Sequence, residues 1–186
     1  MTVDVTTWFL EMKSPEKLRR AAVPQPAPRF ERASVASPEL GRYLYTAVGG
    51  DWYWRDRLDW DYARWMAWLG RTGLETWLLH VQGTPAGYIE LEKQLDAQVE
   101  IVSFGLLPRF VGRGLGGHLL TLGIERAWEM GAKRVWVHTN SLDAPVALKN
   151  FEARGMHRYH WEKEARADFG PPDGPWPDAA RPLPRD

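Results

Sequence analysis

Apolar and polar positions along the chain follow two different periods, and together they predict a fixed order of strands and helices. Short runs of apolar, β-branched and aromatic residues predict strands at 76–81, 86–93, 99–107, 134–139 and 156–162. Apolar residues at helical spacing predict helices at 37–48, 59–70, 115–130 and 145–154. This order is typical of a mixed α/β domain whose first half is rich in hairpins.

The two ends of the chain differ from this pattern. Proline is frequent between residues 13 and 38, so 1–36 is expected to be an N-terminal extension, with short flanking strands at 6–12 and 29–35. Residues 165–186 hold six prolines and predict an extended or disordered tail, which leaves 1–164 as the folded domain. Within helix 115–130 the polar residues fall on one side and predict a solvent-facing stripe of His118, Thr121, Glu125 and Glu129.

Composition excludes several classes of protein. The 186 residues carry 24 Lys and Arg against 24 Asp and Glu, so there is no basic surplus for binding nucleic acid. The absence of Cys excludes a disulfide scaffold, a thiolate zinc site and a Cys nucleophile. Without a signal peptide or a run of about 20 apolar residues, we expect a cytoplasmic protein with no membrane partner. The 11 Trp are a surplus that composition alone does not explain.

The sharpest chemical signal is a cluster of glycines between a predicted strand and helix 115–130: Gly112, Gly114, Gly116 and Gly117, with Arg113 among them. Glycines let successive N–H groups turn inward and let a phosphate approach the backbone. The helix that follows adds free N–H groups and the positive end of its dipole. The cluster therefore predicts a phosphate-binding site.

This cluster has three alternative interpretations. Gly112, Gly114 and Gly117 match G-x-G-x-x-G, but in a dinucleotide fold the glycines follow the strand directly and an acid ends the next strand. Here 108–111 intervene, and the next strand ends in His-Thr-Asn. No Lys-Ser/Thr follows, as a Walker loop requires. A glycine-rich helix start that binds nothing is the remaining alternative.

Two motifs, in the right order and at the right spacing, resemble the GNAT superfamily of acyl-CoA N-acetyltransferases. The first is the strand and loop 99–117, VEIVSFGLLPRFVGRGLGG, and the second is FEARGM at 151–156. The resemblance implies a single domain of the α+β type, with a mixed, mostly antiparallel sheet and helices on both faces. It places the acetyl-CoA-binding core at 76–162 and the acceptor-side helices at 37–75.

The resemblance also implies which residues hold acetyl-CoA: Phe104, Gly105, Leu106, Val111, Gly112, Arg113, Gly114, Gly116, Gly117 and Phe151. The backbone amide of Leu106 is the implied oxyanion donor. Val111 stands where Gln or Arg is usual, and Arg113 or Arg109 is expected to compensate. Phe151 stands where many members carry a Tyr that protonates the departing CoA thiolate. Tyr159 or a water is therefore expected to supply this proton.

Removing a proton from the amine requires a base, for which Glu100 is our first candidate. It lies in a run of apolar residues, where partial desolvation raises the pKa of a carboxyl group. Glu90 and Glu92 on the preceding strand are the rivals, and a Glu100 that faces solvent or pairs with an Arg is the alternative. His138 ends a strand on the acceptor side, where a structural role is favoured over a proton relay.

The resemblance places the acceptor site at 37–70, where much of the Trp surplus lies. Trp52, Trp54 and Trp60 lie outside the helical stripe of the second helix and are the candidate acceptor-side residues, with the alternative of a Trp-rich core and a homodimer face. Asp51, Asp56, Asp59 and Asp61 are candidates to hold an ammonium group. The prediction is acetyl transfer from acetyl-CoA to a primary amine of a small molecule or peptide, without a metal. A non-catalytic acyl-CoA sensor and a dinucleotide-binding module are the alternatives.

Overall fold

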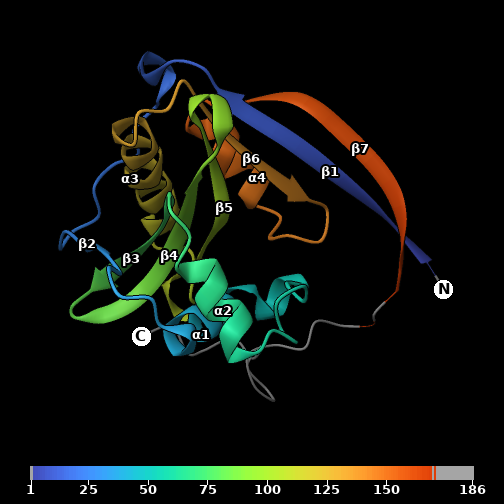
Figure 1. Cartoon of the computed structure of the whole chain (residues 1–186). Helices are drawn as coiled ribbons and strands as arrows, with labels where there is room; N and C mark the ends of the chain where they lie inside the picture. The colour runs from blue at the N-terminus through green and yellow to red at the C-terminus, as the bar shows by residue number, and fades with distance from the viewer. Residues whose placement is uncertain (1, 169, 171–186) are drawn as a thin grey trace.

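A computed structural model of the chain describes residues 2–168 and residue 170. The described residues form one seven-stranded sheet in the order β2-β3-β4-β5-β6-β1-β7 (Figure 1). The strands are β1 (Thr2–Met12), β2 (Arg29–Arg32), β3 (Leu74–Val81), β4 (Thr84–Lys93), β5 (Gln98–Leu106), β6 (Arg134–Asn140) and β7 (His157–Ala167). The helices are α1 (Pro38–Gly49), α2 (Tyr62–Leu69), α3 (Leu115–Glu129) and α4 (Ala147–Ala153).

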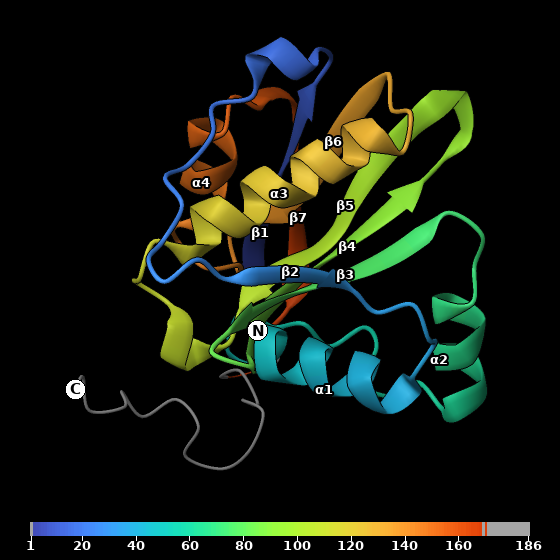
Figure 2. The same ribbon diagram turned by 90° about the vertical axis from the view of Figure 1, so that its left-hand side faces the viewer.

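The sheet is mixed and mostly antiparallel, as predicted. Only β5 and β6 run parallel, because the crossover helix α3 connects them, and the other neighbours pair antiparallel. Alternate residues of β4 face opposite sides: Ile89 and Leu91 pack toward α3, whereas Tyr88 packs against Leu44 and Val48 of α1. Helices therefore cover both faces of the sheet (Figure 2).

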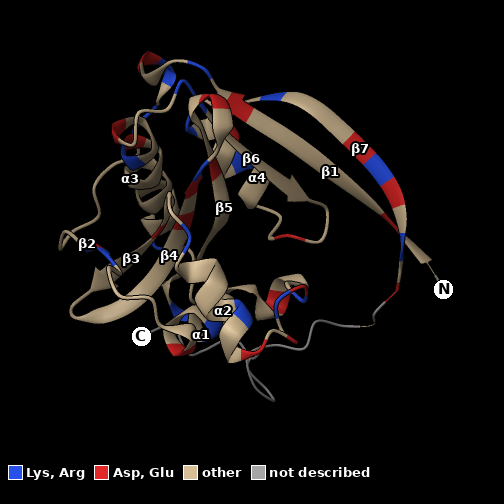
Figure 3. Ribbon diagram, viewed as in Figure 1, with Lys and Arg blue, Asp and Glu red and all other residues tan. Residues whose placement is uncertain are grey.

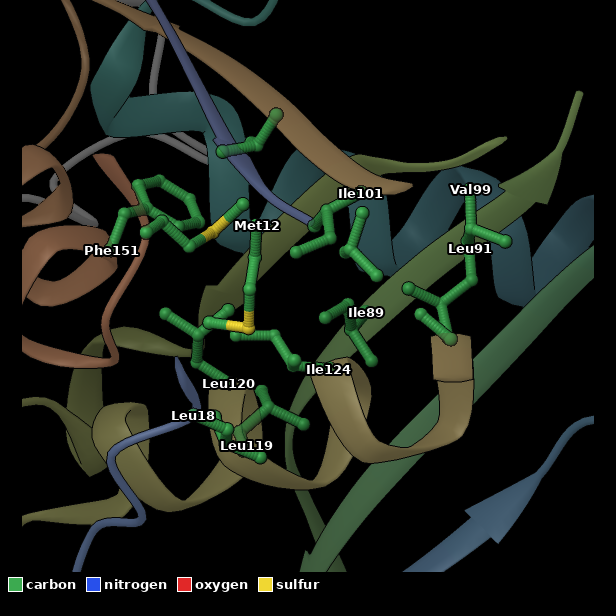
Figure 4. Close-up of a cluster of buried hydrophobic side chains, with 14 of the residues drawn as sticks. Met12, Leu18, Ile89, Leu91, Val99, Ile101, Leu119, Leu120, Ile124 and Phe151 are labelled. Atoms are coloured by element: carbon green, nitrogen blue, oxygen red, sulfur yellow. The ribbon is translucent and has the colours of Figure 1, made fainter. Parts of the chain in front are cut away.

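The larger core lies between α3 and the sheet (Figure 4). Leu119, Leu120 and Ile124 of α3 are fully buried against Ile89 of β4. Each such side chain contributes about 1.5–3 kcal/mol when it leaves water. This core fixes β5 and the start of α3 relative to each other, and both contribute to the site described below.

Two of the predicted helices begin with a side-chain cap. Ser37 precedes Pro38, and its hydroxyl accepts a hydrogen bond from the backbone N–H of Leu40 at 3.2 Å. Asp61 caps α2 by accepting from the N–H of Arg64 at 2.8 Å. Asp61 therefore serves the helix, which is a structural role rather than the ammonium-binding role that was expected of it.

The segment 1–36 was predicted as an extension, and this is wrong for its first third. β1 lies between β6 and β7 and pairs with both, so it is an interior strand of the sheet. Val5, Leu10 and Met12 are buried in the core. The prediction failed because the strands that pair with β1 are more than 120 residues away in sequence.

The polar stripe on α3 was also predicted wrongly in part. His118 and Thr121 are buried, with 7% and 4% exposure. The segment between β1 and β2 runs along α3 (Figure 2), where the N–H of Ala21 donates to the Thr121 hydroxyl at 3.0 Å and Arg20 pairs with Glu125. This segment therefore covers the part of the stripe at Thr121 and Glu125, whereas Glu129 is 67% exposed and faces solvent as predicted.

The last strand is longer than predicted. β7 continues to Ala167 and pairs with the start of β1, so the first residues of the expected tail belong to the sheet. The rest of that tail lies outside the described residues, apart from Asp168 and Gly170.

Candidate active site

β5 and β6 diverge partway along their length, and a cavity of about 740 Å³ opens where they part. They pair at only three positions, Gln98 with Arg134, Val99 with Val135 and Glu100 with Trp136. Beyond these rungs the cavity is lined by 101–106 of β5, 137–140 of β6, 52–54, 56 and 57 of the loop before α2, and 142–147 before α4. The two loops face each other across the gap (Figure 1).

The backbone of β5 offers unpaired polar groups to this gap. The N–H of Leu107 donates to the carbonyl of Ala86 at 2.9 Å, and Leu106 pairs in register with Gly87. Successive residues of a strand point their N–H and C=O groups to opposite sides, so Leu107 points toward β4 and Leu106 points away from it. Phe104 and Leu106 therefore direct their backbone groups toward the gap, and those of Gly105 face β4.

The close packing of α1 on β5 requires a glycine at position 105. A Cβ on this residue would lie 2.4 Å from Cγ1 of Val48, so α1 packs directly on the strand. This close approach places the N-terminal helices over the cavity.

The glycine loop lies at one end of the cavity. Gly112 and Gly114 have φ values of +81° and +76°, which favour glycine, and nothing lies within 4 Å of a Cβ added to either. Val111 and Gly116 line the cavity, and the exposed Arg113 lies beside them in the same loop. The free N–H groups of the first turn of α3 follow at once.

Two other predicted cofactor residues have distinct positions. A Cβ on Gly117 would lie 2.4 Å from Nη1 of Arg154, so this glycine allows α3 to pack closely against its neighbours. Phe151 lines the cavity and packs on Phe104, with ring centroids 5.7 Å apart. Its burial to 3% exposure makes it a wall of the cavity.

Glu100 does not line the cavity itself, although His138 does. Glu100 is 8% exposed, and its Oε1 lies 3.3 Å from Nδ1 of His138. Its Oε2 accepts a hydrogen bond from the side chain of Gln94 at 2.6 Å. The bond to Glu100 is the largest cause that raises the pKa of His138, and Asp143 and Asp56 add to it.

The rival carboxylates are engaged elsewhere. Glu90 is 2% exposed and forms a salt bridge of 2.9 Å with Arg57. Glu92 pairs with Arg71 at 2.8 Å. Neither acid lines the cavity, so the structure gives neither Glu90 nor Glu92 contact with it.

The acceptor-side candidates divide into two groups. Trp52 and Trp54 line the cavity, and Nε1 of Trp54 donates to Oδ1 of Asp143 at 3.1 Å. Trp60 does not line it, because its ring packs on Trp65 and Trp68 at centroid distances of 5.2 and 5.6 Å. Trp60 therefore belongs to this aromatic cluster and is not among the described residues that line the cavity.

Tyr159, the predicted general acid, lies away from the cavity. Its ring lies on β7 against Phe9, at 6.2 Å between centroids, and under the guanidinium of Arg134 at 4.7 Å. It is not among the residues that line the cavity. Nothing in its position supports a role in protonating the leaving group.

Sequence reasoning missed two residues of the site. Tyr45 of α1 lines the cavity and donates its hydroxyl proton to Asp56 at 2.6 Å; burial raises the pKa of this phenol well above its usual range. Asp143 accepts from the Thr139 hydroxyl at 2.6 Å and from the N–H of Asn140 at 3.0 Å. The largely polar run Thr-Asn-Ser-Leu-Asp, which begins at the end of β6, was the available signal for Asp143.

Two further findings concern the described residues only. None of their His, Asp and Glu side chains gather into a group that could hold a metal ion. None of their helices is long and apolar enough to cross a membrane.

Comparison with known proteins agrees with this geometry. The mycothiol acetyltransferase of Corynebacterium aurimucosum is similar to this chain, with 36% identity over 80 residues, which cover 41% of this chain and 26% of that protein. Among solved structures, a GCN5-related N-acetyltransferase from Kribbella flavida is similar with a TM-score of 0.63 and 19% identity, over 91% of this chain and 60% of that one. An aminoglycoside acetyltransferase from an uncultured soil metagenomic sample is similar with a TM-score of 0.57 and 14% identity, over 68% of this chain and 86% of that one.

The chain spans about a quarter of the curated relative and between half and two thirds of the first solved structures. The sequence model of the acetyltransferase (GNAT) family matches residues 41–159, which is more than half of the chain and includes β5, the glycine loop and α3. The chain therefore belongs to the acetyltransferase (GNAT) family.

Proposed function

We propose that the chain transfers the acetyl group of acetyl-CoA to a primary amine by direct attack of the amine on the thioester. The observation that carries this proposal is the cavity at the divergence of β5 and β6, which reaches the glycine loop before α3. Family membership and the mycothiol acetyltransferase relative support acetyl transfer in general. The chain has no Cys, so a cysteine acyl-enzyme is not part of the proposal.

The residues around the gap fit the parts of acetyl-CoA. The glycine loop 112–114 and the first turn of α3 offer N–H groups to a diphosphate, and Arg113 adds positive charge. The outward backbone groups of Phe104 suit the amides of the pantetheine arm. The N–H of Leu106 is the proposed donor to the thioester oxygen, on which negative charge develops during attack.

The charges of the cavity favour a cationic acceptor. Asp56 and Asp143 line it, whereas the lining Arg57 and Arg166 are paired with Glu90 and Glu164. The aromatic rings of Trp52 and Trp54 line the same side and can hold a cation against their faces. We therefore propose an acceptor that carries a second ammonium group besides the one that reacts.

Thiol release tests the proposed reaction directly. Because the protein has no Cys, all thiol detected by a colorimetric reagent with acetyl-CoA and an amine must come from CoA. We expect turnover with a diamine and binding of acetyl-CoA by calorimetry. Absence of both would refute the proposal, and binding of acetyl-CoA without turnover across an amine panel would favour the non-catalytic sensor.

Three acceptors of equal length test the acceptor class. We expect kcat/KM to fall in the order pentane-1,5-diamine, pentan-1-amine, 5-aminopentanoate, because the distal group changes from cationic to neutral to anionic. Asp56→Asn should reduce the preference for the diamine. Asp51→Asn is the matched control, since Asp51 lies in the same loop but does not line the cavity. An unchanged preference for the diamine in Asp56→Asn would contradict the proposal that Asp56 binds the second ammonium group.

The dinucleotide-binding alternative has less support. A dinucleotide fold is built from two βαβαβ halves with a mainly parallel sheet. The described residues contain one parallel pair, β5 and β6. Calorimetry with NAD as the titrant is the control for this alternative, and we expect no binding.

A further inference from the structure

His138 occupies the first position on β6 from which a side chain can reach back across the gap to β5. The last rung between the two strands pairs Glu100 with Trp136, and His138 follows two residues later on the same face. Its Nδ1 lies 3.3 Å from Oε1 of Glu100. The contact therefore joins the two strands at the point where they part.

Glu100 is held so that one oxygen faces the imidazole. Its other oxygen, Oε2, accepts from Nε2 of Gln94 at 2.6 Å, and Oε1 of Gln94 accepts in turn from Nε1 of Trp136 at 3.0 Å. These two hydrogen bonds fix the carboxylate of Glu100 in a buried position, where a carboxylate oxygen without a hydrogen-bond partner is costly. Nδ1–H of His138 is the donor that satisfies it.

This arrangement selects one tautomer of the neutral imidazole. Because the carboxylate accepts only, the hydrogen lies on Nδ1 and the lone pair on Nε2. Among the described residues that line the cavity, His138 is the only imidazole, and its side chain is 48% exposed. Nε2, the ring nitrogen that does not contact Glu100, therefore carries the free lone pair, on a side chain that lines the cavity.

We propose that His138 is the general base that takes the proton of the attacking amine through Nε2, with Glu100 as its positioning residue. This inference rests on the proposed acetyl transfer. It changes the role first predicted for Glu100, which acts through the imidazole instead of on the amine. A buried carboxylate behind a base also stabilises the imidazolium that forms.

The proton and bond balance is complete without another reactant. The amine arrives as an ammonium ion and gives one proton to solvent before its nitrogen attacks the thioester carbon. As the C–N bond forms, Nε2 of His138 takes the second proton; the C–S bond then breaks, and this proton returns to the CoA thiolate directly or through water. The products are the amide, the CoA thiol and one released proton.

The charged groups around His138 determine its pH dependence. Glu100 on β5, Asp143 after β6 and Asp56 before α2 all raise the pKa of the imidazole, and the neighbouring rings of Phe9 and Trp136 carry no charge. A base works in its unprotonated form, so kcat should rise with pH through a value above the ordinary 6.5. Glu100→Gln should move this limb to lower pH.

Variants at His138 test the role in turnover. We expect His138→Gln to lower kcat/KM by about 10²- to 10⁴-fold, the range for a general base, with acetyl-CoA binding unchanged in calorimetry. Added imidazole should partly restore His138→Ala. His160→Gln is the matched control, since His160 also has an acidic partner, Glu162, at 3.1 Å, but does not line the cavity. A His138→Gln variant within about 3-fold of wild type at every pH would overturn the proposal.

A second measurement stands independently of any acceptor. Ring ¹⁵N chemical shifts of His138 should identify protonated Nδ1 and unprotonated Nε2 in the neutral form, and its titration should move to lower pH in Glu100→Gln. The reverse tautomer overturns the role of His138 even if no acceptor is found. Wild-type protein that shows the expected tautomer but no turnover with any amine would instead count against the proposed function.

Discussion

At the scale of single residues, Arg57 connects the aromatic cluster to the sheet. Its Nη1 pairs with the buried Glu90, and its guanidinium lies over the rings of Tyr45, Trp60 and Trp68 at 5.4, 5.2 and 4.1 Å. The pairing is nearly out of solvent, with side-chain exposures of 7% and 2%. A buried pair of this kind is sensitive to the loss of either partner.

Arg57→Met should lower the free energy of unfolding by about 3–5 kcal/mol, because it leaves the charge of Glu90 buried without a partner. Urea denaturation at pH 7 measures this. Arg158→Met is the control: it breaks the exposed pair with Glu152 and should cost at most about 1 kcal/mol. Equal losses of unfolding free energy in the two variants would contradict the role of Arg57 as the partner of a buried charge.

Two glycines with similar backbone geometry separate strain from binding. Gly114 precedes α3 at φ +76°, and Gly83 lies in the β3–β4 turn at φ +82°, both with open space around an added Cβ. Ala at either position should cost about 1–2 kcal/mol of stability through the backbone alone. Only Gly114→Ala should weaken acetyl-CoA binding in calorimetry, because its backbone N–H belongs to the loop that we propose binds the diphosphate. Weaker binding in Gly83→Ala as well would show that strain, not the loop, is responsible.

Several residue roles could not be read from the sequence. The glycine loop is local, so its spacing alone indicated a phosphate site. Glu100 and His138 are 38 positions apart, and only the pairing of β5 with β6 brings them together. Trp60 was misjudged because helical periodicity does not show that its ring folds onto Trp65.

At the scale of elements, the helices and the central strands were predicted well because their signals are local. α1 begins at Pro38, one residue after the predicted start at 37, and α2 begins at Tyr62, three residues after the predicted start at 59. β1 was judged a flanking strand because its partners β6 and β7 come from the other end of the chain. Long-range contact also explains the partial error on α3, where Thr121 and Glu125 contact the segment that follows β1.

His118 provides a prediction for α3 and this segment. Burial lowers the pKa of His118, so the folded state favours the neutral imidazole more strongly than the unfolded chain does. The resulting stability is complete above the ordinary pKa of 6.5 and is lost as the pH falls below it. Between pH 7.5 and 5.5 the urea midpoint should therefore fall further in wild type than in His118→Gln. The same pH dependence in both proteins would contradict the burial of a titrating His118.

At the scale of the whole molecule, the proposed acetyl-CoA-binding half and the proposed acceptor half were not equally predictable. The core at 76–162 follows local motifs and resembles a known family, whereas the acceptor side depends on loops that meet only in the folded chain. The Trp surplus illustrates the difference. Trp65 is core, Trp60 packs on it, and only Trp52 and Trp54 of the five Trp in 52–68 line the cavity.

The outer edge of the sheet concerns the whole molecule because it decides how one copy meets another. β7 is the last strand, and every one of its residues is exposed. Acidic and basic residues alternate along it (Figure 3), including Glu162, Lys163 and Glu164, and the pairing with β1 is interrupted by a bulge between Phe9 and Leu10. Charges and bulges on an edge strand oppose pairing with other edges. Self-association, suggested by the aromatic content, is therefore expected at another face.

Removing these charges should convert the edge into an aggregation site. A variant with Glu162→Thr, Lys163→Thr and Glu164→Thr retains residues that favour strands and exposes an uncharged edge, so we expect concentration-dependent association in light scattering. A control with Glu16→Thr, Lys17→Thr and Glu39→Thr removes the same charges from exposed positions outside the edge and should behave like wild type. If both variants associate equally, net charge controls solubility; if neither does, the bulge and the twist of β7 protect the edge without its charges.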